Sequence, residues 1–375
     1  MKKLLKEVAK IGAGQGAPQG EESYSMDGIP FVKAGNLSDL SKGASIDSIL
    51  KVSDAVAKKY GLKLYSKGTI LFAKSGMSCL KGYVYVLPKE AYVVNHLACI
   101  MPKEDISDYL KLYFDYYKPS RLIKDFAYPS ISLTDIGNVQ IELFDEKTRD
   151  VIIASLKTLQ SLIYNRKKQL ELLDQLVKAR FVEMFGDPIK NQKAFPVFCL
   201  EDVIKFQGGS QPDKKFFEYE PTGDNIRLIQ IRDYKTNNYI TYIPKSKAKR
   251  FCKADDIMIG RYGPPIFQIL QGIEGAFNVA LMKAIPKTGN KEFFRYFLKQ
   301  KCLLEYLEGM SARTAGQDGI QMDKLKAYPC PLPPIDLQNQ FADFVGQVDK
   351  SKQTIQQNIK QLEILEKSLM QKYFG

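Results

Sequence analysis

The chain has 375 residues, of which 45% are apolar and 11% aromatic, a composition typical of a folded protein with room for two domains. No stretch approaches the ~18 consecutive apolar residues of a membrane span, and no hydrophobic segment follows the N-terminal lysines, so we expect a cytoplasmic protein without a signal peptide. The net charge is +13, with the excess mainly in residues 147–186 and 187–335. This excess favours a polyanionic partner such as nucleic acid, although solvated lysine surfaces produce the same pattern.

The residues that usually carry catalysis or bind metals are sparse. The only histidine, His96, lies in the apolar run VVNHLACIM and is interpreted as a core or groove residue, not a catalyst. The six cysteines show no CxxC spacing and are predicted to be buried free thiols, without zinc or disulfides. The glycines of residues 12–16 lack GxGxxG spacing and are predicted to form a turn.

Two proline pairs invite comparison with the base-holding motif of DNA adenine methyltransferases. The segments 263–266 and 332–335 lack the polar residue and the aromatic residue with which such enzymes hold a flipped adenine. We therefore expect no active site in this chain.

Residues 1–146 are predicted to form a compact, β-rich α/β domain, because short apolar runs alternate with glycine and polar turns. Two helices are predicted, at residues 55–60 and 107–117, with Ser107 as the N-cap of the second. The predicted strands are residues 29–32, 69–72, 83–87, 92–94 and 139–143.

A long helix is predicted over residues 147–186, where apolar residues recur alternately every four and three positions. The same seam returns 189 residues later in a second helix, 336–375, which follows an extended proline run and has Asp336 as its expected N-cap. Two helices with this repeat most simply pair with each other. The predicted pairing residues are Ile152, Leu156, Leu159, Ile163, Leu170, Leu173, Phe341, Val345, Val348, Ile355, Ile359 and Leu362.

Charged residues interrupt this seam and suggest a register for the pair. In an antiparallel arrangement Glu366 would lie near Lys157, and Lys352 near Glu171 or Asp174. The alternative is that these long side chains only extend out of the seam into solvent.

Residues 187–335 repeat the order of the first block. The segment 68–76 corresponds to 255–263, Asn95 corresponds to Asn278, and 131–143 corresponds to 320–332. The chain is therefore predicted to be a tandem duplication of α/β (α+β) class, with an antiparallel coiled coil and a pseudo-twofold axis. The predicted order is a domain over 1–146, a helix over 147–186, a domain over 187–335 and a helix over 336–375.

The order of these motifs resembles the specificity subunits of type I restriction-modification systems. The resemblance rests on the duplicated blocks, on PLPP followed by Gln338 and Gln340 at the start of the last helix, and on the first helix running into FGDP at 185–188. It implies that each block is a target recognition domain that reads one half of a bipartite double-stranded DNA site. It also implies that the paired helices set the half-site spacing and bind DNA methyltransferase subunits.

The resemblance further implies a restriction and translocase subunit as partner and no cofactor on this chain. No membrane association is expected, because no apolar run is long enough to span a membrane. S-adenosylmethionine would be bound by the methyltransferase partners.

Basic and amide side chains in loops are the expected DNA contacts, because they recognise guanine, adenine and phosphate. The loops AKSGMS and GRYGPP differ, so we expect two unlike half-sites and an asymmetric target. The candidate residues of the first domain are Gln15, Lys33, Asn36, Lys74, Ser75, Met77, Ser78, Lys81, Arg121, Lys124 and Tyr128. Those of the second domain are Gln211, Gln230, Arg232, Arg261, Tyr262, Arg313, Thr314 and Gln317. For each of them a solvated surface role is the alternative.

Two other classes of function stay open at this point. One is a protein interaction scaffold that binds nucleic acid without sequence preference. The other, less favoured, is an enzyme that uses His96.

Overall fold

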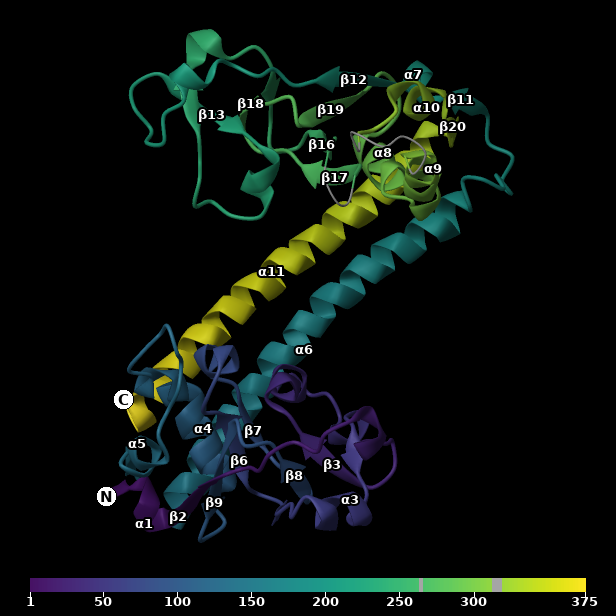
Figure 1. Ribbon diagram of the computed structural model, residues 1–375. Helices are drawn as coiled ribbons and strands as arrows, with labels where there is room; N and C mark the ends of the chain where they lie inside the picture. The colour runs from purple at the N-terminus through teal and green to yellow at the C-terminus, as the bar shows by residue number, and fades with distance from the viewer. Residues whose placement is uncertain (263–265, 312–318) are drawn as a thin grey trace. The chain divides into compact units, whose positions relative to one another are not determined.

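The computed structural model describes residues 1–262, 266–311 and 319–375, which divide into two compact units (Figure 1). Unit 1 comprises Met1–Lys167 and Gln357–Gly375, and unit 2 comprises Lys168–Gln356. The two long helices, α6 (Glu146–Phe185) and α11 (Ile335–Phe374), each contribute a segment to both units. The sequence-based division kept helices and globular blocks apart, whereas in the structure they share hydrophobic cores.

Unit 1 contains two four-stranded sheets and a two-stranded ladder. The first sheet is antiparallel, whereas in the second the central strands β3 and β8 are parallel. The first sheet has the order β2 (Ala9–Ala13), β9 (Leu97–Pro102), β6 (Ile70–Ala73), β7 (Val84–Val86). The second has the order β4 (Lys51–Val52), β3 (Ile29–Val32), β8 (Ala91–Val93), β5 (Leu64–Tyr65), and the ladder pairs β1 (Lys2–Leu4) with β10 (Gln140–Glu142).

Both helices predicted in residues 1–146 are present, as α3 and α4, with one change at a cap. Ser107 is not the N-cap of α4: Ile106 holds that position, and the Ser107 hydroxyl donates instead to the carbonyl oxygen of Gly68 at 2.8 Å. All five predicted strands are present within about a residue of the expected bounds. The helices are α1 (Leu5–Val8), α2 (Leu37–Leu40), α3 (Asp54–Lys59), α4 (Ser107–Tyr117) and α5 (Leu133–Gly137). Strands β1, β2, β4, β5 and β9 and helices α1, α2 and α5 had not been predicted.

Unit 2 repeats this topology strand for strand, which confirms the duplication. Its central pair, β13 and β18, is parallel like β3 and β8. The first sheet has the order β12 (Ile204–Gly208), β19 (Leu281–Pro286), β16 (Ile257–Gly260), β17 (Gln268–Gln271). The second has the order β14 (Tyr242–Pro244), β13 (Asn225–Ile229), β18 (Gly275–Phe277), β15 (Phe251–Cys252), and β11 (Val197–Cys199) pairs with β20 (Pro329–Pro331). The helices are α7 (Leu200–Val203), α8 (Lys291–Leu298), α9 (Lys301–Ser311) and α10 (Met322–Ala327).

One glycine in each unit lets the chain leave the first sheet and pass against the second. A Cβ on Gly14 would lie 2.2 Å from the carbonyl oxygen of Val93, and a Cβ on Gly209 would lie 1.9 Å from that of Asn278. Only glycine permits such an approach. Residues 12–16 are consequently extended along the strands, and the turn predicted for them is wrong.

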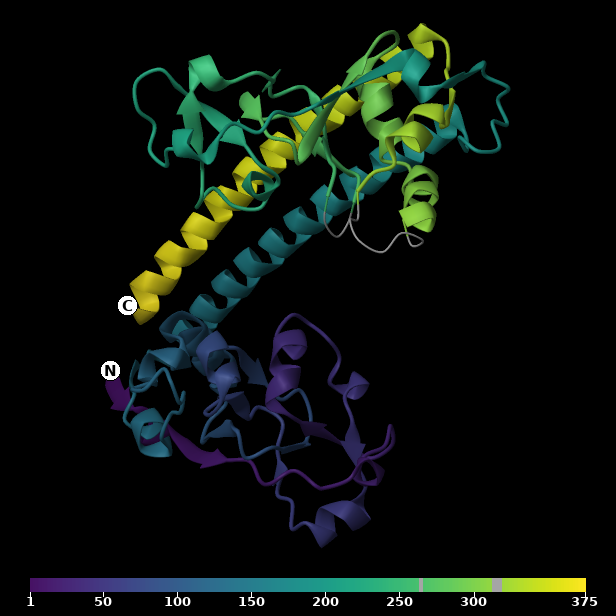
Figure 2. The same cartoon turned by 45° about the horizontal axis from the view of Figure 1, so that its top comes forward.

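Segments of α6 and α11 run antiparallel and side by side within each unit (Figures 1 and 2). In unit 1 the buried Ile152 and Leu156 share a core with Met370, and in unit 2 the Phe181 and Phe341 rings lie 5.4 Å apart. All twelve predicted pairing residues are buried or half-buried, as expected for a heptad seam. Least buried among them are those near the middle of the helices: Leu170, Leu173, Ile355 and Leu362.

The predicted helix register is correct at one end and one turn off at the other. Lys352 forms the expected ion pair with Asp174 at 2.5 Å. Glu366 accepts a hydrogen bond from Gln160 at 2.9 Å, whereas Lys157 pairs with Asp108 on α4. Helix α11 begins at Ile335, so the predicted N-cap Asp336 lies in the first turn instead.

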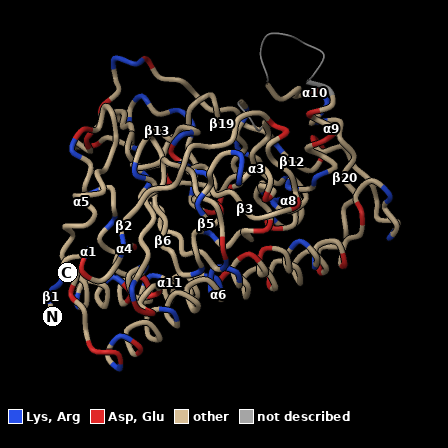
Figure 3. Tube along the Cα trace, turned by 60° about the horizontal axis from the view of Figure 1, so that its bottom comes forward, with Lys and Arg blue, Asp and Glu red and all other residues tan. Residues whose placement is uncertain are grey.

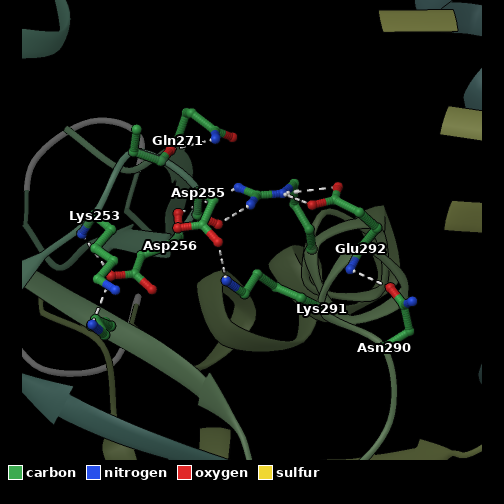
Figure 4. A network of polar contacts seen from close by, with 10 residues as sticks. Lys253, Asp255, Asp256, Gln271, Asn290, Lys291 and Glu292 are labelled. Atoms are coloured by element: carbon green, nitrogen blue, oxygen red, sulfur yellow. Dashed lines mark hydrogen bonds and ion pairs between the residues drawn. The ribbon is translucent and has the colours of Figure 1, made fainter. Parts of the chain in front are cut away.

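The turn before β16 is anchored to α8 by a polar network (Figure 4). The buried guanidinium of Arg295 pairs with Glu292 at 3.0 Å and donates to the carbonyl oxygen of Asp255 at 2.7 Å. Lys291 pairs with Asp255, and Lys283 with Asp256. The start of β16 is therefore fixed to a helix, and β16 leads directly into the loop that carries Arg261 and Tyr262.

The cysteines are free, and Cys79, Cys99, Cys252 and Cys330 are buried as predicted, whereas Cys199 is exposed. Burial raises the pKa of the Cys79 thiol to about 11, so this thiol stays protonated and unreactive near neutral pH. Within the described parts of the chain, no group of three or more metal-ligating side chains is found. In the same parts, no helix has the length and apolarity required to cross a membrane.

Candidate nucleic-acid interface

Strands of both sheets end at one edge of unit 1, which we call the loop edge of unit 1. In the first sheet the end of β6 pairs with the start of β9, Ala73 with Leu97, and the end of β2 lies beside it. The parallel strands β3 and β8 end together, at Val32 and Val93. The loop edge therefore collects residues 14–16, 33–36, 74–81 and 94–96.

Backbone hydrogen bonds hold these loops together. Lys74 donates its backbone N–H to the carbonyl oxygen of His96 at 2.9 Å, and Gly76 donates to that of Pro129 at 3.0 Å. The Ser75 hydroxyl lies 2.8 Å from His96 Nδ1. The His96 side chain is exposed here, so of the two interpretations, core or groove residue, the core one is wrong. His96 is a candidate nucleic-acid contact that the sequence analysis did not include, because it lies within an apolar run.

The candidates of unit 1 differ in how strongly the fold already engages them. Gln15 donates to the carbonyl oxygen of Gly61 at 2.7 Å and accepts from the backbone of Lys63, so its amide holds a turn. Asn36 accepts from the backbone N–H of Lys33 at 2.8 Å and caps its own turn. Lys74, Ser75 and Ser78 are half-buried, and Met77, Lys81 and Tyr128 are exposed.

Two further candidates of unit 1 have partners on neighbouring helices. The Arg121 guanidinium lies 5.7 Å from the Tyr117 ring on α4. Lys124 forms an ion pair with Asp135 on α5 at 2.9 Å. Both side chains are exposed, so these contacts leave them accessible to a ligand.

Unit 2 presents an equivalent loop edge with different side chains. The bridge between Tyr262 and Gly319 repeats that between Ser75 and Ser130. Arg261 donates to the carbonyl oxygen of Val279, the counterpart of His96, at 3.3 Å.

Among the remaining candidates of unit 2, Gln230 and Arg232 both donate to the hydroxyl of Thr241. Gln211 is exposed and donates to the carbonyl oxygen of the adjacent Pro212. Arg313, Thr314 and Gln317 lie outside the described residues.

The loop edges of the two units share the same backbone turn but carry different side chains. The backbone N–H of Lys33 is capped by Asn36, and the backbone N–H of Gln230 at the same strand end is capped by Asp233. Along α6, lysine and arginine are interspersed with acidic residues (Figure 3), whereas the candidates at the loop edges include cationic and amide side chains and no acidic one. Such side chains are hydrogen-bond donors suited to base edges and phosphate oxygens.

Two copies of one α/β fold, each carrying cationic and amide donors on loops at one edge, define a duplicated nucleic-acid-binding protein. The family described as "Type I restriction modification DNA specificity domain" matches residues 1–173 and 192–364. The chain belongs to this family.

Individual relatives agree with this assignment. The type I restriction enzyme MjaIX specificity subunit of Methanocaldococcus jannaschii is 29% identical over 193 residues, which are 49% of this chain and 43% of that protein. The match thus spans less than half of the relative's length. The crystal structure of a type I restriction-modification S subunit from M. genitalium has a TM-score of 0.57 at 13% identity, covering 100% of this chain and 96% of that one. A chain from a structural study of complex assembly in a type I system has a TM-score of 0.60 at 16% identity, covering 100% and 97%. At these identities the structures show a shared fold.

Proposed function

We propose that this chain is the non-catalytic, sequence-specific DNA-binding subunit of a type I restriction-modification complex. Each loop edge reads one half of a bipartite duplex target. The observation that carries the proposal is that a DNA specificity family matches both repeats, while the corresponding loops carry different donors. The equivalent positions are Lys33 and Gln230, Lys74 and Arg261, and His96 and Val279. Unlike donors select unlike bases, so the target is asymmetric.

The long helices serve as spacer and docking surface in this proposal. Each is 40 residues long, which corresponds to roughly 60 Å at ~1.5 Å per residue, and each contributes to the core of both units. Their pairing sets the separation of the two half-sites, and their remaining faces bind DNA methyltransferase subunits. A restriction and translocase subunit joins through these partners.

The chemistry resides in the partners. S-adenosylmethionine binds to the methyltransferase subunits, and this chain determines the DNA sequence at which the complex binds. The complex acts in the cytoplasm, where the DNA is.

A competition experiment tests the proposal. Methylated adenines are first mapped in a genome that carries the complete system, which yields both half-sites and their spacing. A labelled duplex with this sequence is then bound by the chain and its partners at fixed salt. The unlabelled target is expected to compete at least about a thousandfold better than scrambled DNA. Duplexes with one scrambled half should compete poorly, whichever half is changed.

Equal competition by target and scrambled DNA would support instead a scaffold that binds nucleic acid without sequence preference. The His96→Ala variant separates the remaining alternative. It should still assemble with its partners, and any loss of methylation should be accompanied by a matching loss of DNA binding; loss of methylation with retained DNA binding would indicate an enzyme that uses this imidazole.

A further inference from the structure

The turn after β13, at the loop edge of unit 2, holds two donor side chains on one acceptor. Gln230 Nε2 and Arg232 Nη2 donate to Thr241 Oγ1, at 3.0 and 3.1 Å. Thr241 is fully buried, so this acceptor is fixed in the fold. The Arg232 guanidinium also lies 5.9 Å from the Tyr239 ring. Arg232 is thus an exposed side chain with a defined direction.

A buried ion pair supports the turn from behind. The Asp233 side chain is 1% exposed, and its Oδ2 lies 3.4 Å from Arg227 Nη2. The same oxygen accepts the backbone N–H of Gln230 at 3.3 Å. Burying a carboxylate is unfavourable unless it is paired and hydrogen-bonded. Because the Asp233 contacts fix the backbone on both sides of Arg232, they restrict where its side chain can project.

Unit 1 builds the same turn without these groups. Asn36 replaces Asp233 as the capping residue, and Gly35 occupies the position of Arg232. A neutral cap is therefore sufficient for the backbone of the turn. The arginine, its acceptor and the buried carboxylate are additions of unit 2, which indicates a role in what that unit binds.

The exposed part of Arg232 suits a base edge. One N–H of Nη2 is directed at Thr241, and Nε and Nη1 have no hydrogen-bond partner among the described residues. A guanidinium can donate two parallel hydrogen bonds to O6 and N7 of guanine in the major groove. A side chain held in advance at its tip loses little rotamer freedom on binding, which favours a specific contact over a mobile phosphate contact.

We propose that Arg232 reads a guanine in the half-site bound by unit 2, and that Thr241 and Asp233 are positioning residues for this contact. The inference rests on the proposed function and assigns one base pair of the target to one side chain.

The test is a binding-site selection by the chain assembled with its partners, from a pool of randomised DNA duplexes at fixed salt. Arg232→Ala and Arg232→Lys are compared with Lys235→Ala, which removes a neighbouring exposed cation. Both Arg232 variants should lose the preference for one G·C pair, by about 5- to 100-fold, and keep every other preference. The lysine variant retains the charge but lacks the planar guanidinium that donates two parallel hydrogen bonds and is held at Thr241. Lys235→Ala should leave all preferences unchanged.

Two results would overturn the inference while the proposed function stands. In the first, Arg232→Ala weakens binding to all sequences equally and lowers the salt dependence by about one ion, as for a phosphate contact. In the second, the selected sequence is the same with and without Arg232. If the unaltered chain selects no sequence at all, the proposed function itself is wrong.

The positioning residues are tested at the same base pair. Thr241→Val retains the side-chain shape and removes the shared acceptor, and Asp233→Asn removes the buried charge. Each of these two variants should reduce the preference for that G·C pair alone. The double variant Arg232→Ala/Thr241→Val should show the same preferences as Arg232→Ala alone, because Thr241 acts through Arg232. A general loss of protein stability would weaken binding to all sequences and would not change the preference at one base pair only. If Asp233→Asn fails to fold, Thr241→Val provides the test, and an unchanged preference in it would exclude Thr241 from positioning Arg232.

Discussion

Arg295 shows how much a single side chain contributes when it is buried with its partners. Removing it leaves the Glu292 carboxylate and the carbonyl oxygen of Asp255 without this donor, whereas the carbonyl oxygen of Asp256 still accepts from the backbone N–H of Gly272. Arg295→Ala is expected to destabilise unit 2 by about 2–4 kcal/mol. The matched control is Lys111→Ala at the equivalent position of unit 1, where the lysine pairs with Asp115 near the surface. This control should cost under ~1 kcal/mol. Urea unfolding measures both, and equal losses would contradict the argument.

Gly14 offers a second test at the residue scale, because the obstacle to a side chain there is rigid backbone. The Cβ of Gly14→Ala would meet the carbonyl oxygens of Val93 and Val94 at 2.2 Å. We expect a loss of roughly 2–4 kcal/mol in unit 1, with displacement of Gln15 from β8. Gly16→Ala is the control, since nothing lies within 4 Å of its Cβ. Thermal unfolding of both variants checks this, and a neutral Gly14→Ala would show that the strands separate easily.

At the scale of elements, Phe341 joins the two long helices within unit 2. It is fully buried, and its ring lies 5.4 Å from both Phe181 and Phe185 on α6. Phe341→Ala is expected to destabilise unit 2 by about 3–5 kcal/mol through the cavity it leaves. Val182→Ala, on an exposed position of α6, should change stability by less than ~0.5 kcal/mol. Comparable denaturation midpoints for the two variants would mean that the helices do not depend on each other.

The surface ion pairs between the helices act differently from this aromatic contact. Lys167 with Glu363 and Lys352 with Asp174 are partly exposed, and such pairs contribute little net stability. They do select one alignment of α6 on α11, because another register would separate the charges. Apolar burial therefore stabilises the pairing of the two helices, and the ion pairs favour its register.

At the scale of the whole molecule, the end of the chain completes the unit that contains its beginning. Phe374 packs against Tyr109 and Tyr113 of α4, at ring distances of 5.4 and 5.9 Å, and Met370 is buried in the same core. Deletion of residues 357–375, which form the second chain segment of unit 1, should therefore destabilise that unit. Hydrogen exchange at β6 and β9 should become faster in the truncated chain than in the full-length chain.

A milder pair of variants controls for the truncation. Phe374→Ala should reproduce part of the effect on unit 1, while Lys372→Ala, on an exposed position of the same turn, should not. Unchanged exchange in unit 1 after truncation would mean that residues 1–167 are sufficient for its fold.

The local pattern of the sequence determined the parts of the structure that depend on near neighbours. The heptad seam from Ile152 and its repeat from Phe341 specify buried helix faces, and the repeated order of strands specifies two similar domains. Element bounds followed because apolar runs and turn residues act over a few positions. The run containing His96 was misread, since a continuous apolar stretch does not reveal which residue sits at a strand end.

Tertiary structure decided which distant residues meet. It placed Gln15 on the backbone of Gly61 and Lys63, and it made Thr241 the common acceptor for Gln230 and Arg232. It also divided each long helix between two cores. These outcomes depend on sheet order and on the parallel pairing of β3 with β8 and of β13 with β18, which no short-range pattern encodes. The type of a loop residue shows which hydrogen bonds its side chain can form. Whether that side chain is free to contact DNA depends on the partners that folding brings next to it.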